Sequence, residues 1–176
     1  MKVLVFGATG NIGRYLISDL RKHGWTASGT CAHADVEGLT RFRVEADEFS
    51  ATPFAGERWD FGVICCAISG IDECKRNLSQ SRAVNIVGTM RLAGQLACRG
   101  IVPVFLSSDY VFSGEKGSYV EGDSVDPVTA YGQQKAEVEE WLRNHVENAL
   151  IVRLSKVISV DPSDSTLLSD WYRAMG

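Results

Sequence analysis

Three residues in the second half of the chain have the types and spacing needed for proton transfer. Tyr131 and Lys135 are four residues apart, so on a helix they share one face. An ammonium beside a phenol favours the phenolate, and we therefore expect the pKa of Tyr131 to lie below its ordinary value of about 10. Ser108 follows an apolar run, and its hydroxyl could hydrogen-bond a substrate carbonyl oxygen while charge develops there. The set predicts acid–base chemistry at a carbonyl or alcohol, with Ser108, Tyr131 and Lys135 as catalytic residues.

A glycine-rich turn near the N-terminus predicts a dinucleotide site. The apolar run Val3–Phe6 ends in Gly7, Gly10 and Gly13, and a helical apolar pattern follows. Gly7 permits a sharp exit from a strand, Gly10 lets backbone N–H groups approach a pyrophosphate, and Gly13 allows close packing of helix on strand. A tight turn without any ligand is the alternative. The residues expected to bind the cofactor here are Gly7, Thr9, Gly10, Asn11, Ile12 and Gly13.

The residues after the second expected strand bear on the choice between NAD(H) and NADP(H). NAD-selective sites place an acidic residue there to bind the ribose 2′-hydroxyl, but in this chain the first carboxylate after the strand is Asp35. The absence of a nearer acid removes repulsion of a 2′-phosphate. Arg41 and Arg43 could supply a cation, or could equally be solvated surface residues. We expect NADP(H) or NAD(H), with a slight preference for NADP(H).

Strand and helix signals alternate along the chain, which predicts one α/β domain. Continuous apolar runs are typical of parallel strands that are buried on both faces. The expected strands are Val3–Phe6, Trp25–Thr30, Phe42–Glu45, Phe61–Ala67, Val102–Leu106 and Leu150–Leu154. Beyond the first helix, long helices are expected over Ser79–Cys98 and Thr129–Val146. This rhythm predicts a doubly wound parallel Rossmann-type sheet with helices on both faces.

Composition narrows the class of protein. The 176 residues are 45% hydrophobic and 23% charged, which suits one globular domain. A net charge of -4 without a polybasic run argues against a nucleic-acid partner. We find no signal-peptide pattern and no run long enough to cross a membrane, and so expect a cytoplasmic protein. The five cysteines form no C-x-x-C pair, so we expect reduced thiols and no metal site. Adjacent Cys65 and Cys66 should point to opposite faces of a strand.

Several segments together resemble a known family. Residues 7–13 (GATGNIG), 65–77 (CCAISGIDECKRN) and 83–93 (AVNIVGTMRLA) match its glycine turn and two following motifs. Residues 105–139, from FLSSDYVFSG to YGQQKAEVE, match its most specific block nearly throughout. The chain resembles the extended short-chain dehydrogenase/reductase family and, within it, the dTDP-4-dehydrorhamnose reductase branch, over most of residues 1–155.

The resemblance implies roles for individual residues. Ser108 would polarise the substrate oxygen, Tyr131 would be the general acid, and Lys135 would hold the nicotinamide ribose. It further implies cofactor or active-site positions for Asp47, Ala67 and Asn85, and substrate contacts for Asp109 and Tyr110. Simpler structural interpretations exist for three of these: a turn-forming aspartate at 47, a buried amide at 85 and a capping carboxylate at 109.

The resemblance also implies a reaction: hydride transfer from NAD(P)H to the keto group of a nucleotide-sugar. Residues 1–160 would form the NAD(P)-binding domain, and 161–176 the start of a truncated C-terminal substrate-binding region. One departure concerns the substrate, because Arg153-Leu-Ser-Lys-Val-Ile-Ser159 stands where the branch has Arg-Thr-Ser-Trp-Leu-Tyr-Gly.

Two other functions fit the same motifs. One is an NAD-dependent nucleotide-sugar epimerase or dehydratase, which returns the hydride to its substrate. The other is a non-catalytic, dinucleotide-binding regulatory subunit, a role to which this branch has been adapted. The resemblance further suggests a homodimer formed through the helices that contain Asn85 and Tyr131.

Overall fold

A computed structural model describes residues 1–33, 36–159, 161, 164 and 174. Its centre is a six-stranded sheet in the order β3-β2-β1-β4-β5-β6, and every paired strand runs parallel to its neighbour. The strands are β1 (Lys2–Phe6), β2 (Thr26–Cys31), β3 (Leu39–Arg41), β4 (Phe61–Ile64), β5 (Val102–Ser108) and β6 (Leu150–Leu154). This order is that of a Rossmann-type fold, in which the winding reverses between β1 and β4. The predicted fold class is confirmed.

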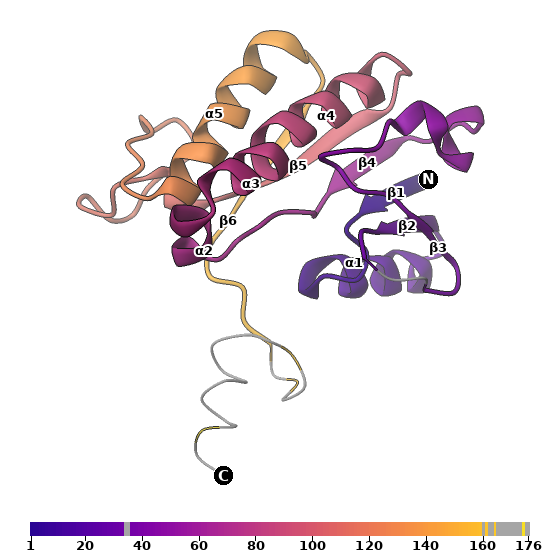
Figure 1. Ribbon diagram of the computed structural model, residues 1–176, viewed down its shortest axis with the longest axis horizontal. Helices are drawn as coiled ribbons and strands as arrows, with labels where there is room; N and C mark the ends of the chain where they lie inside the picture. The colour runs from indigo at the N-terminus through magenta and orange to yellow at the C-terminus, as the bar shows by residue number, and fades with distance from the viewer. Residues whose placement is uncertain (34–35, 160, 162–163, 165–173, 175–176) are drawn as a thin grey trace.

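Helices cover both faces of the sheet (Figure 1). The α-helices are α1 (Asn11–Lys22), α2 (Ile71–Arg76), α3 (Leu78–Arg82), α4 (Thr89–Ala97) and α5 (Ala130–His145). A π-helical segment, η3 (Ala83–Gly88), joins α3 to α4, so that the long helix expected over Ser79–Cys98 is one continuous run with a π turn inside it. Three short 3₁₀ segments complete the list: η1 (Phe49–Ala51), η2 (Pro53–Gly56) and η4 (Asp109–Val111).

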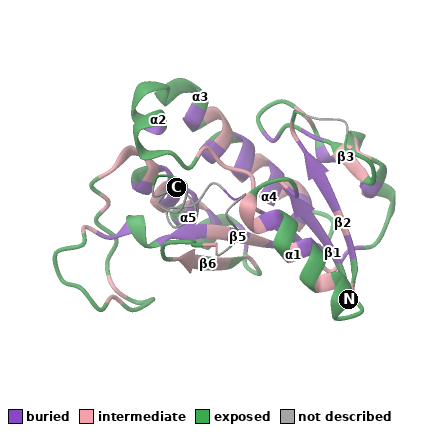
Figure 2. Cartoon of the chain, turned by 90° about the horizontal axis from the view of Figure 1, so that it is seen from below, coloured by how far each residue is buried: buried purple, intermediate pink, exposed green. Residues whose placement is uncertain are grey.

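The two faces of the sheet carry separate apolar clusters. One cluster includes Ile17 of α1 and the β1 side chains that face it. The larger cluster includes Leu92 of α4 and Leu142 of α5, each at most 1% exposed. Figure 2 shows the buried residues gathered in the central strands and on the inner sides of the helices. Cys65 packs against the first cluster and Cys66 against the second, which confirms that they point to opposite faces.

The expected third strand was misplaced. The ladder partners of β2 are Leu39–Arg41, three residues before the predicted Phe42–Glu45. Phe42 and Val44 are nevertheless buried, because the chain turns into the core there rather than continuing along the sheet. The turn is closed by the Asp47 carboxylate, which accepts a hydrogen bond from the Arg43 backbone N–H at 2.7 Å. Alternating apolar residues therefore marked burial in a loop and not a strand.

The segment after β4 also differs from expectation. The sheet pairing of β4 ends at Ile64, although the strand was expected to continue to Ala67. Helix α2 was not expected at all; it is only six residues long, which is too short for a helical apolar period to be recognised.

Two further predictions concern membrane helices and the C-terminal region. No helix among the described residues is long and apolar enough to cross a membrane. The C-terminal region expected at 161–176 lies outside the described residues, apart from positions 161, 164 and 174.

Candidate active site

The glycine turn brings the end of β1 against the end of β4. Gly7 has a φ of +88°, which favours glycine, and a Cβ at this position would lie 2.8 Å from the backbone nitrogen of Cys66. A Cβ on Gly13 would lie 2.3 Å from the Gly7 carbonyl oxygen. Two glycines are thus required for this close approach of turn, helix and strand.

Helix α1 begins directly after this turn. Its N-cap residue is Gly10, which has no side chain with which to cap the helix. The first N–H groups of a helix, together with the helix dipole, favour the binding of phosphate. The turn is therefore suited to a pyrophosphate, as the sequence predicted.

A cavity of about 470 Å³ opens at the carboxyl edge of the sheet, where such folds bind ligands. One side is formed by the glycine turn through Gly10, Asn11, Ile12 and Gly13. The opposite side is formed by Ala67, Ser108, Asp109, Tyr110, Tyr131 and Lys135. Ten residues that were predicted from sequence thus meet around one space.

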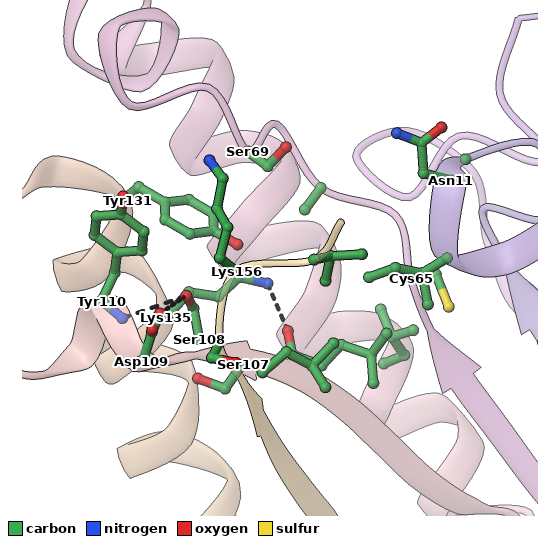
Figure 3. Close-up of a pocket in the computed structure, with 18 of the residues that line it drawn as sticks. Asn11, Cys65, Ser69, Ser107, Ser108, Asp109, Tyr110, Tyr131, Lys135 and Lys156 are labelled. Carbon is green, nitrogen blue, oxygen red and sulfur yellow. Dashed lines mark hydrogen bonds between the residues drawn. The ribbon is translucent and has the colours of Figure 1, made fainter. Parts of the chain in front are cut away.

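Lys135 is buried beneath the cavity and fixed by its neighbours. Its Nζ donates a hydrogen bond to the Leu106 carbonyl oxygen at 2.7 Å (Figure 3). The same Nζ lies 4.6 Å from the centre of the Phe105 ring and 5.5 Å from that of Tyr131, so the charge is held between two aromatic faces. Burial lowers the pKa of Lys135 to about 8, against the opposing effect of the Cys66 and Cys65 thiols.

The expectation of a lowered tyrosine pKa is wrong for this structure. Burial raises the pKa of Tyr131 to about 12, and the groups at Cys74, Asp109 and Tyr110 raise it further. The physical reason is that desolvation penalises the phenolate. The Lys135 ammonium lies at the ring of Tyr131 and donates its short hydrogen bond to a backbone carbonyl instead. Tyr131 is therefore held protonated, as a general acid requires.

Ser108 lies where β5 ends and η4 begins. Its Oγ donates to Asp109 Oδ1 at 3.0 Å and accepts from the Tyr110 backbone N–H at 3.3 Å. The hydroxyl thus caps the 3₁₀ turn, and the turn holds Asp109 and Tyr110 at the cavity. The Tyr110 ring meets the Tyr131 ring edge to face, with centroids 6.1 Å apart.

Asn85 is a buried amide within the helical segment η3. Its Oδ1 accepts from the Ile68 backbone N–H at 2.8 Å, and its Nδ2 donates to the Ile68 carbonyl oxygen at 2.8 Å and to Gln134 Oε1 at 2.7 Å. Gln134 in turn donates to Ser81 Oγ at 2.8 Å. The amide is thus engaged within the protein, and it ties the loop after β4 to the helix that carries Tyr131. A direct contact with the cofactor stays a prediction.

Three further predicted cofactor residues do not line the cavity. Gly7 packs against the backbone of Cys66, Thr9 is exposed, and Asp47 closes its own loop with Arg43. Their roles as cofactor ligands stay predictions. Arg43 pairs with Asp47 at 3.6 Å, whereas Arg41 is exposed on the edge strand β3.

Sequence reasoning missed the residues that β4, β5 and β6 bring to the cavity. These include Cys65, Ser69, Ser107 and Lys156. Their positions follow from strand register, because neighbouring parallel strands end at the same edge of the sheet. The replacement of tryptophan by Lys156 was the one signal that could have pointed to this group.

A buried ion cluster of Glu139, Arg143 and Arg153 lies on the helix and strand next to the site. The Glu139 side chain is 0% exposed, and its carboxylate accepts hydrogen bonds from Arg153 at 2.7, 2.9 and 3.2 Å and from Arg143 at 2.7 Å. Arg153 also donates to the Glu121 carbonyl oxygen at 3.1 Å and lies over the Phe112 ring. The cluster joins β6 and the loop before α5 to the helix of Tyr131 and Lys135.

Comparison with known proteins identifies a family model and several relatives that match the chain. A model of the RmlD substrate binding domain matches residues 1–166. The chain belongs to this family. The chain is 31% identical over 185 residues to a probable low-salt glycan biosynthesis reductase, Agl14, of Haloferax volcanii, with 97% of this chain and 59% of the relative covered. It is 27% identical over 175 residues to the methionine adenosyltransferase 2 subunit beta of Danio rerio, with 95% and 52% covered.

Among solved structures, the RmlD-family fold is matched by a dTDP-4-dehydrorhamnose reductase from Bacillus anthracis in complex with NADP. The TM-score is 0.85 at 20% identity, over 98% of this chain and 59% of that one. The chain spans about half to three fifths of the length of the relatives that it matches. By name, the relatives of this chain thus include a probable glycan biosynthesis reductase and a subunit of an adenosyltransferase.

Proposed function

We propose that this chain is the cofactor-binding and catalytic part of an NAD(P)H-dependent reductase that acts on the keto group of a nucleotide-sugar. The observation that carries the proposal is that the glycine turn and Ser108, Tyr131 and Lys135 line the same cavity. Names of relatives support the same class of reaction, since they include a dTDP-4-dehydrorhamnose reductase and a glycan biosynthesis reductase.

The residues present fit a dinucleotide. Added Cβ atoms on Gly7 and Gly13 would collide with backbone, so the turn is shaped for backbone approach. The N-terminus of α1, with glycine at its N-cap, suits a pyrophosphate. When bound, the cofactor supplies the hydride. A preference for NADP(H) is supported by the lack of an acid directly after β2 and by the NADP in the Bacillus anthracis relative.

The roles of the chain's own residues follow from their surroundings. Tyr131 holds its proton at neutral pH and donates it from Oη to the substrate oxygen. Ser108 Oγ donates to the same oxygen after exchanging its hydrogen bond with Asp109. Lys135 places a positive charge beside the phenol, which offsets the negative charge left on Tyr131 when the proton departs.

The test is the substitution Tyr131→Phe in the full chain. We expect NADPH to bind as it does to the wild type, while oxidation of NADPH with a dTDP-4-keto-sugar slows at least about a hundredfold. Tyr15→Phe on the exposed side of α1 is the matched control and should retain turnover, since Tyr15 does not line the cavity. Unchanged turnover in Tyr131→Phe would remove Tyr131 from the mechanism.

A second candidate is a dinucleotide-binding regulatory subunit, favoured by the likeness to the beta subunit of methionine adenosyltransferase 2. Cofactor binding without reduction of any keto-sugar, together with a constant bound partner, would support it. An epimerase or dehydratase would instead retain tightly bound NAD and consume no NADPH. A homodimer through the helices of Asn85 and Tyr131 stays a prediction.

A further inference from the structure

A second hollow adjoins the active-site cavity on the side away from the glycine turn. It measures about 460 Å³ and shares Ser69, Tyr110 and Lys156 with the cavity. The remaining lining comes from α2 and the residue before it, including Arg76. The two hollows are therefore neighbours, and Lys156 lines both.

Lys156 brings a cation to both hollows. Its side chain lies within the cavity among Tyr131 and Ser69 (Figure 3). No carboxylate in the described part of the chain lies within 4 Å of its ammonium, whereas Lys2 and Lys116 each form an ion pair. An ammonium that faces a concave polar site without a counter-ion is suited to an anionic ligand.

The second hollow also contains two acidic side chains and a second cation. Asp72 and Glu73 lie on α2 and also line it, as does Arg76, whose Nε donates only a long hydrogen bond of 3.4 Å to the Asp72 carbonyl oxygen. Lys156 is the one cation that reaches both the hollow and the Tyr131 cavity within the described residues. The acids on α2 are acceptors suited to the hydroxyl groups of a sugar.

Lys156 lies near Tyr131 in the cavity. Figure 3 shows its side chain between Tyr131 and Ser69, whereas Asn11 of the turn expected to bind the pyrophosphate lies farther from Tyr131. A substrate with its keto oxygen at Tyr131 would therefore share the cavity with the Lys156 side chain. The branch that this chain resembles has tryptophan at this position, so an aromatic side chain is replaced here by a cation.

We infer that Lys156 is a specificity-determining residue that pairs with an anionic oxygen of the substrate, either a carboxylate on the sugar or its diphosphate. This inference rests on the proposed function. Under this inference Lys156, which follows β6, selects among nucleotide-sugars. The general acid Tyr131 cannot make that selection.

The experiment measures binding of three probes to the full chain loaded with NADPH. UDP-glucuronate carries both anions, UDP-glucose carries only the diphosphate, and free glucuronate carries only the carboxylate. Titration calorimetry is performed on the wild type, Lys156→Met, Lys156→Arg and the matched control Lys75→Met, an exposed α2 lysine outside both hollows. Because Lys156 is exposed, we expect Lys156→Met to weaken binding about fivefold, with Lys156→Arg and Lys75→Met close to wild type.

The pattern of losses identifies the anion. A loss confined to UDP-glucuronate and glucuronate supports the carboxylate, and an equal loss for both UDP-sugars supports the diphosphate. Equal affinities in wild type and Lys156→Met, or no binding of any probe to the NADPH-loaded wild type, would overturn the inference while leaving the reductase proposal intact. Failure of the wild type to bind NADPH would instead overturn the proposed function.

Discussion

The substitution Glu139→Gln tests whether the buried ion cluster holds the catalytic helix in place. Glu139 is fully buried on α5, whereas its partner Arg153 is 13% exposed and belongs to β6. Glutamine keeps the shape of the side chain but removes its charge and one acceptor. The change therefore leaves a largely buried guanidinium without a carboxylate.

The expected loss follows from the exposure of the partners. Removal of one member of a buried ion pair costs about 3–5 kcal/mol, because the remaining charge is not compensated. We take the lower value, about 3 kcal/mol, because Arg143 is 49% exposed and can turn to solvent. For a chain of this size, about 3 kcal/mol corresponds to a fall in Tm of about 6–12 °C.

The dependence on pH gives a second readout. Burial alone would raise the pKa of Glu139, but the hydrogen bonds from Arg153 and Arg143 outweigh it and the pKa lies below its ordinary value. The cluster's contribution is therefore complete above the unfolded-state pKa and is lost as the pH falls through the lower folded-state pKa. Glu139→Gln should remove that acid-range loss of stability.

The assay is thermal and urea unfolding of the wild type, Glu139→Gln and the control Glu137→Gln. Glu137 is also on α5 but pairs with Arg82 at the surface, where both side chains are more than 40% exposed. The control should change the free energy of unfolding by less than about 1 kcal/mol. Equal effects of the two substitutions would refute the reasoning.

Two further perturbations test the turn and the buried lysine. Gly13→Ala should lower stability and weaken NADPH binding at least about tenfold, because its Cβ would meet the Gly7 carbonyl oxygen at 2.3 Å. The control Gly56→Ala, whose Cβ would have no atom within 4 Å, should change neither stability nor NADPH binding. Wild-type affinity for NADPH in Gly13→Ala would contradict the close approach. Lys135 has a folded-state pKa of about 8 against an ordinary 10.5, so the unfolded chain binds more protons between these values and stability due to this group rises with pH. The stability difference between wild type and Lys135→Met, measured by urea unfolding, should therefore shift in favour of wild type from pH 8 to pH 9, and a flat difference would contradict the lowered pKa.

Much of the site could be read from sequence because its signals are local. The glycine spacing at 7–13 encodes a backbone approach that side chains would block, and the spacing of Tyr131 and Lys135 encodes one helix face. Signals that depend on distant partners were misread. Phe42 and Val44 alternate like a strand but are buried in a loop, since the ladder with β2 had already ended at Arg41.

The amino-acid sequence by itself predicted the fold class from the alternation of strands and helices along the chain, and the glycine turn and the Tyr131–Lys135 pair from spacing within a few residues. Only the tertiary structure decided the protonation of Tyr131, since burial outweighs the neighbouring ammonium and burial depends on what packs around the ring. It alone decided that Asn85 braces a loop and that Lys156 enters the cavity, because both depend on which strands and helices end side by side.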